Sequence, residues 1–188
     1  MPPRPTKWIK RNDRPEPLLS PSVMQGRNGN TPSTQQNQLF APITSDTNQP
    51  ISAFRATSNA NLSVAANAAS GVRFQNVQFD LANEYISYMS RFPPRTAGVY
   101  SLNASVEFQT NAIVDFNLEV VFLVNQDVIG GNSQFQAGNL PAVVAITEIL
   151  QLNAGDTVTV AMRSTAAGFI QATPRTRFAA ARVPSPTA

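Results

Sequence analysis

The sequence predicts an all-β protein, an antiparallel β-sandwich of the jelly-roll type that carries a long extended arm at its N-terminus. Three observations support this fold class. Apolar and polar residues alternate along the middle of the chain, short apolar runs recur between turn residues, and prolines are concentrated in the first fifty residues. Helical periodicity is weak throughout, so strands must supply the core.

The clearest predicted strand begins at Gly98 and continues to Phe108, with an apolar residue at nearly every second position. A second strand, residues 114–124, has the same period. Its other face turns apolar at Val121 and Leu123, so we expect this part to line a subunit interface. The side chains assigned to the core of the sandwich are Phe92, Tyr100, Leu102, Phe108, Phe116, Phe122, Val158 and Phe178.

Shorter strands and the turns between them complete the sandwich. Gly155 suits a turn residue with positive φ, and Asp156 can accept local backbone hydrogen bonds in the same hairpin. Residues 126–142 are expected to be an exposed loop, punctuated by Gly130 and Gly131. The shorter strands are predicted at 51–57, 72–80, 143–152, 157–163, 168–172 and 177–183.

The first 49 residues are predicted to be an extended, proline-rich, basic arm, followed by the β domain at 50–184 and a short tail at 185–188. Nine of the fifteen prolines lie in residues 1–50, where they exclude regular helix and central strand. Residues 1–40 carry a net charge of +4, which leaves −1 for the remainder. Without a partner, a disordered tail is the alternative interpretation. The charged and apolar residues assigned to docking on a partner are Arg4, Lys7, Trp8, Ile9, Lys10, Arg11, Arg14, Leu18, Leu19, Val23 and Met24.

The composition limits the chemistry of the chain. It contains no cysteine and no histidine, which excludes disulfides, Cys/His metal sites and the usual nucleophile–base pairs. The carboxylates are scattered, and we interpret Asp115 and Glu119 as a solvated or interface face instead of an acid–base pair. We therefore predict no catalytic residue, no cofactor and no metal site.

Charge and hydropathy also limit the partners. No apolar run approaches the 18 or more residues of a membrane span, and no apolar segment follows the basic N-terminus as in a signal peptide. We expect no membrane partner and synthesis in a host cytoplasm. The charge of the arm is modest and is interrupted by Asp13 and Glu16, which favours an acidic protein surface over nucleic acid as its partner.

Five segments, taken in order, resemble the C1q/TNF-like jelly-roll family. The hairpin Ile149-Leu150-Gln151-Leu152-Asn153-Ala154-Gly155-Asp156-Thr157-Val158 matches the family pattern Leu-x-Leu-x-x-Gly-Asp-x-Val. The residues that lead to Gly98-Val99-Tyr100 resemble the opening of its long core strand. The chain departs from the family at 124–126, where Val-Asn-Gln replaces Lys-Asn-Gly, and at Ala180, where glycine is usual. The resemblance covers residues 53–56, 74–108, 124–126, 149–158 and 177–183.

This resemblance implies a jelly roll of about ten strands that assembles into a tight threefold homotrimer. Domains similar to it occur in secreted vertebrate proteins, on bacterial spores and in phage virions. Our first hypothesis is a decoration, or cement, protein of a bacteriophage capsid, whose arm docks on the major capsid protein at the virion surface.

Two alternatives remain open at this point. One is a head-fibre or tail-fibre knob that binds a host receptor or a host-surface glycan through the 126–142 loop. The other is a cellular C1q-like protein, either secreted or on a spore surface. The loop residues assigned to ligand contacts are Gln134, Phe135, Gln136 and Asn139.

Overall fold

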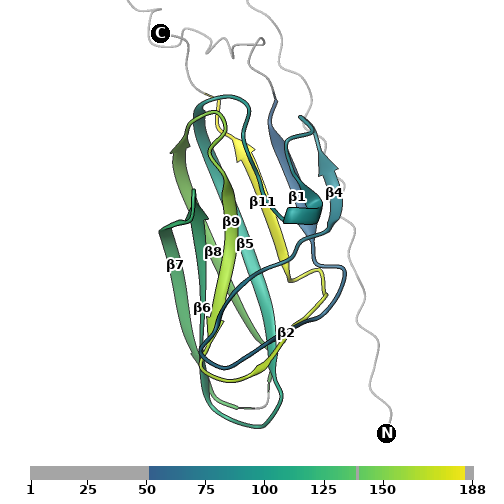
Figure 1. Cartoon of the computed structure of the whole chain (residues 1–188), viewed down its shortest axis with the longest axis vertical. Coiled ribbons are helices and arrows are strands. Elements are labelled where there is room, and N and C mark those ends of the chain that lie inside the picture. Colours follow the sequence, from purple (N-terminus) through teal and green to yellow (C-terminus); the bar gives the residue numbers. More distant parts are fainter. Residues whose placement is uncertain (1–50, 139, 185–188) are drawn as a thin grey trace, which may run out of the picture. The chain divides into compact units, whose positions relative to one another are not determined.

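The structure is a computed structural model that describes residues 51–138 and 140–184. These residues form two packed sheets, and every strand pairing is antiparallel (Figure 1). The prediction of an all-β antiparallel sandwich is confirmed. The strands are β1 (Ala53–Thr57), β2 (Leu62–Val64), β3 (Ala69–Gly71), β4 (Asn76–Asp80), β5 (Gly98–Thr110), β6 (Phe116–Val124), β7 (Asp127–Gln136), β8 (Ala142–Leu152), β9 (Val158–Ser164), β10 (Gly168–Ile170) and β11 (Arg177–Arg182), and one 3₁₀ turn, η1, spans Ser87–Met89.

The two sheets differ in size. The seven-stranded sheet has the order β2-β10-β5-β11-β1-β4, and β8 pairs with β5 off this path. The four-stranded sheet has the order β3-β9-β6-β7. Strands β10 and β11 both pair with β5, at Ile170↔Phe108 and Arg177↔Ser105. They therefore lie one after the other along the same side of β5, and β1 and β2 lie in the same way along β11 and β10.

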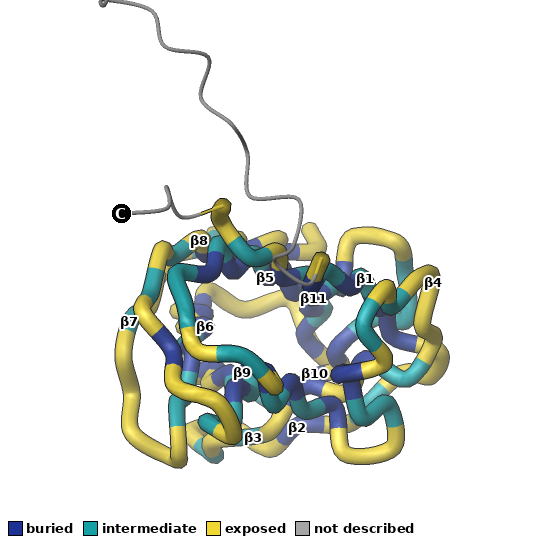
Figure 2. The backbone as a smooth tube through the Cα atoms, turned by 90° about the horizontal axis from the view of Figure 1, so that it is seen from above, coloured by how far each residue is buried: buried dark blue, intermediate teal, exposed yellow. Residues whose placement is uncertain are grey.

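The core lies between the sheets and contains the eight side chains that the alternation pattern places inside, all of them buried. Dark blue segments of the tube in Figure 2 mark these buried stretches on both layers. Phe178 on β11 is central, because its ring centroid lies 4.9 Å from that of Phe54, 5.7 Å from that of Phe74 and 5.9 Å from that of Phe122. Its contact with Phe122 joins the two sheets.

The prediction of a loop at 126–142 is wrong, because most of this segment forms strand β7 along β6. Gly130 and Gly131 lie inside the strand and not in a turn. A Cβ at Gly130 would be 2.3 Å from Oε1 of Glu148, and one at Gly131 would be 2.9 Å from Cγ1 of Val121. The glycines therefore permit close approach of neighbouring side chains, a role that composition alone does not distinguish from a turn.

The single strand predicted at 72–80 is also wrong. The chain passes from β3 in the smaller sheet to β4 in the larger one. Between them, the Val72 amide donates to the carbonyl of Val160 at 2.9 Å, and the Phe74 amide donates to Oγ of Ser90 at 2.8 Å. Because the segment changes sheets here, its ladder is interrupted.

Candidate functional site

The outer face of the seven-stranded sheet is built mainly from small, uncharged side chains. Across its strands, Ala53 pairs with Ala181, Ala181 with Ser101, and Ser101 with Ile149. In a strand, successive side chains point to opposite faces, so residues in register share a face. This row therefore lies on the side away from the core.

Larger apolar side chains lie at the two edges of this face. On β4 and just beyond it, Phe79 and Leu81 are exposed, and on β8 Val143 and Ile149 are exposed. Arg55, which pairs with Phe79, carries one of the few charges on this face. A sheet face of a soluble protein usually carries polar residues where it meets water, so this face has the character of a contact surface.

At one end of the sandwich, two turns are tied together by Asn125 and Asp156. Nδ2 of Asn125 donates to Oδ1 of Asp156 at 2.9 Å, and the amide of Thr157 donates to Oδ1 of Asn125 at 2.9 Å. The other carboxylate oxygen of Asp156 accepts from the Asn153 amide at 2.7 Å. Hydrogen bonds from Asn125, and then from Asn153, lower the pKa of Asp156 below its usual value. Gly155 has φ +87° in the same turn.

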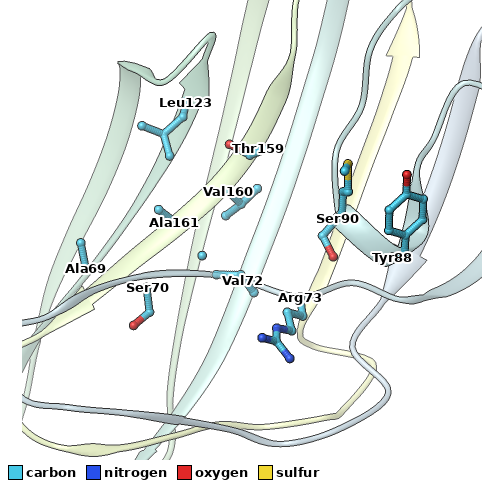
Figure 3. A pocket seen from close by; sticks show the side chains of 12 residues that line it. Ala69, Ser70, Val72, Arg73, Tyr88, Ser90, Leu123, Thr159, Val160 and Ala161 are labelled. Atoms are coloured by element: carbon cyan, nitrogen blue, oxygen red, sulfur yellow. The ribbon is translucent and has the colours of Figure 1, made fainter.

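On the other sheet, a hollow of about 460 Å³ opens between β3, η1 and β9. We call it the Tyr88 hollow. In Figure 3, Tyr88 and Arg73 lie at one end and Leu123 at the other. The sequence alone does not reveal this site, because four segments distant in the chain build it. The lining residues used below are Gly71, Arg73, Tyr88, Thr159 and Ala161.

The remaining predicted site residues are placed differently or not at all. The arm residues between Arg4 and Met24, and Asn139, lie outside the described residues. Gln134, Phe135 and Gln136 lie on β7, not in a loop. Because adjacent strand residues point to opposite faces, Gln134 and Phe135 do not form one contact surface, and the loop site is not formed as predicted.

Several acidic residues of the described part have structural partners. Oδ1 of Asp115 accepts from the Gly138 amide at 2.8 Å, and Oε1 of Glu107 pairs with Nη1 of Arg175 at 3.3 Å. Within residues 51–138 and 140–184, no three Asp or Glu side chains gather closely enough to hold a metal ion. The same part contains no helix that is long and apolar enough to cross a membrane.

The two sheets and their strand order define a jelly-roll domain. The model of the C1q domain matches residues 53–179, and the chain therefore belongs to the C1q domain family. No curated protein matches its sequence.

Solved structures show the same fold at low sequence identity. Eiger TNF from S. frugiperda is 15% identical with a TM-score of 0.55, and the match covers 74% of this chain and 99% of that chain. Murine APRIL at pH 5.0 is 13% identical with a TM-score of 0.55, covering 71% of this chain and 99% of that one.

Proposed function

We propose that the chain is a non-enzymatic structural protein of a virion, a homotrimeric decoration protein on the surface of a phage capsid. Its arm docks on the major capsid protein and stabilises the shell. The observation that carries this proposal is the outer face of the seven-stranded sheet, which is suited to contact between copies of the chain. The domain family and the composition of the arm supply the rest of the argument.

The contact between copies uses the small side chains at the centre of this face. Ala53, Ala181 and Ser101 leave room for the edge of a neighbouring sandwich to approach closely. The apolar residues at the margins, such as Ile149 and Leu81, are 69% and 59% exposed. Their burial in a trimer contributes free energy in proportion to the apolar area removed from water. A trimer also matches the threefold positions of an icosahedral shell.

The arm supplies the attachment in this proposal. Fully extended, fifty residues reach at most about 165 Å, at roughly 3.3 Å each, which is enough to cross a neighbouring subunit. Its excess of positive charge attracts an acidic capsid surface. Trp8 and the apolar residues near Leu18 would act as anchors, since large buried side chains dominate the energy of such contacts.

Deletion of residues 1–40 tests the role of the arm. We expect the truncated protein to remain a soluble trimer by light scattering and to lose binding to capsids that lack the decoration protein, measured by co-sedimentation. A full-length variant with Lys7, Lys10 and Arg11 replaced by Gln should bind capsids more weakly, and its binding should depend less on salt concentration. Normal decoration by the truncated protein would contradict the proposal.

Copy number on the particle separates this function from that of a fibre knob. A decoration protein occupies many equivalent sites over the shell, whereas a fibre knob is present in a few copies at one vertex or tail. Quantitative mass spectrometry of purified particles measures this ratio. A few copies per particle would favour the receptor-binding alternative.

A further inference from the structure

The floor of the Tyr88 hollow is open because its residues are small. Gly71 on β3 pairs with Ala161 on β9, and Ala69 lies two residues before Gly71 on the same strand. A Cβ added at Gly71 would meet no atom within 4 Å. Its φ also lies outside the left-handed region, so neither packing nor backbone geometry requires glycine here. The consequence of glycine at this position is free space in the hollow.

The rim of the hollow is a turn that holds a large aromatic residue in solvent. Ile86 and Arg91 close the turn with reciprocal backbone hydrogen bonds of 2.8 and 3.2 Å. Ser90 adopts φ +51°, and its Oγ accepts from the Phe74 amide at 2.8 Å. Tyr88 at the tip is 74% exposed. A non-glycine residue in the left-handed region carries strain, and such strain concentrates at ligand-binding sites.

The charge at the hollow is positive. Among the described residues that line it, Arg73 alone is charged. Within the described part of the chain, the one ion pair joins Arg175 to Glu107, so Arg73 is available to an anion. The hydroxyl of Thr159, two residues before Ala161 and on the same face of β9, lies on this lining and can donate and accept a hydrogen bond.

We propose that the Tyr88 hollow binds a saccharide that carries a carboxylate. The apolar C–H face of a sugar ring stacks on Tyr88, and the guanidinium of Arg73 holds the carboxylate through two parallel hydrogen bonds. Sugar hydroxyls exchange hydrogen bonds with Thr159. The volume falls within the range of about 300–1,000 Å³ that is typical of small-ligand sites.

This site is independent of the proposed attachment to a capsid. It lies on the four-stranded sheet, whereas the contact between copies is placed on the seven-stranded sheet and the attachment on the arm. A decorating trimer and a cell-surface trimer would both leave it accessible. A mutation that abolishes ligand binding in the hollow therefore leaves attachment to the capsid testable, and the reverse also holds.

Titration of the intact full-length protein tests the proposal. Tri-galacturonate is the probe, maltotriose is its neutral counterpart, and binding is followed by saturation-transfer NMR and calorimetry. We expect the acidic sugar to bind at least about tenfold more tightly than the neutral one, a difference of about 1.4 kcal/mol. Binding should weaken as salt rises, since an ion pair at an open site is screened.

Three variants locate the binding in the hollow. Tyr88→Ala and Arg73→Gln should each weaken binding of tri-galacturonate by about tenfold or more, and Gly71→Leu should block it by filling the free space. Tyr88→Phe keeps the ring and should retain binding. Ile129→Ala removes an exposed apolar side chain on β7 and should change nothing. Unchanged melting temperatures show that the variants are folded.

Three results would overturn the proposal. The first is binding of tri-galacturonate that Gly71→Leu leaves intact, and the second is no binding at millimolar concentration. The third is tighter binding of a tri-glutamate peptide than of the sugar, which would make the hollow a site for acidic peptides.

Discussion

The outer faces of the two sheets have different surface chemistry although they flank the same core. The seven-stranded face is broad, carries alanine and serine at its centre, and has apolar side chains such as Ile149 at its margins. The four-stranded face contains the Tyr88 hollow, with one guanidinium and an exposed aromatic ring. The first suits a copy of the same chain and the second a small polar ligand. In a sandwich, the inward positions fix the fold, so the two outward faces are free to take separate roles.

A substitution in the core that the two sheets share should cause the largest loss of stability. Phe178→Ala removes a fully buried ring that contacts aromatics of both sheets, and we expect a loss of about 3–5 kcal/mol in the free energy of unfolding. Urea denaturation measures it. Phe135→Ala, at an exposed site of the smaller sheet, should stay within about 0.5 kcal/mol. A small loss for Phe178→Ala would mean that the sheets do not depend on this contact.

One substitution made on each face tests the comparison directly. Ala181→Arg places a charge between Ala53 and Ser101 on the seven-stranded face, and we expect it to convert the trimer into monomers, since an unpaired charge cannot be buried at low cost. Ala161→Arg places the same charge beside Gly71 in the hollow and should leave the trimer intact. Light scattering measures the mass of each. Dissociation by Ala161→Arg alone would reverse the assignment of the faces.

The turn contact between Asn125 and Asp156 should have a smaller effect, which depends on pH. The pKa of Asp156 is lower in the folded chain than its unfolded value of about 3.9. The ionised carboxylate therefore stabilises the fold above that pH, and this contribution is lost as the pH falls through the folded pKa. Asp156→Asn should lower the urea midpoint at pH 7 and should approach the parent protein at an acidic pH below the folded pKa of Asp156. An equal deficit at both pH values would exclude the ionised form as the cause.

Alternation in the sequence was sufficient to predict the fold class and the core, because inward residues such as Tyr100 and Phe108 repeat with the period of a strand. It failed at Gly130 and Gly131, where the reason for glycine is the side chain of a neighbour on another strand. It also missed the Tyr88 hollow, because Arg73, Tyr88 and Ala161 approach one another only after the chain has folded. Contacts between distant segments leave no periodic signal in a single sequence.

The turn between β6 and β7 should give the smallest change in stability. Asn125 and Gln126 both have positive φ, +53° and +80°, in a two-residue connection between Val124 and Asp127. Glutamine in the left-handed region costs about 1 kcal/mol. Glycine avoids this cost, but its greater conformational entropy in the unfolded chain offsets part of the gain. Gln126→Gly should therefore raise the free energy of unfolding by about 0.5 kcal/mol, measured by urea denaturation. Asn125→Gly should lower it instead, because that side chain bonds to Asp156 and Thr157. If both variants were stabilised alike, backbone strain would outweigh the hydrogen bonds that link the two turns.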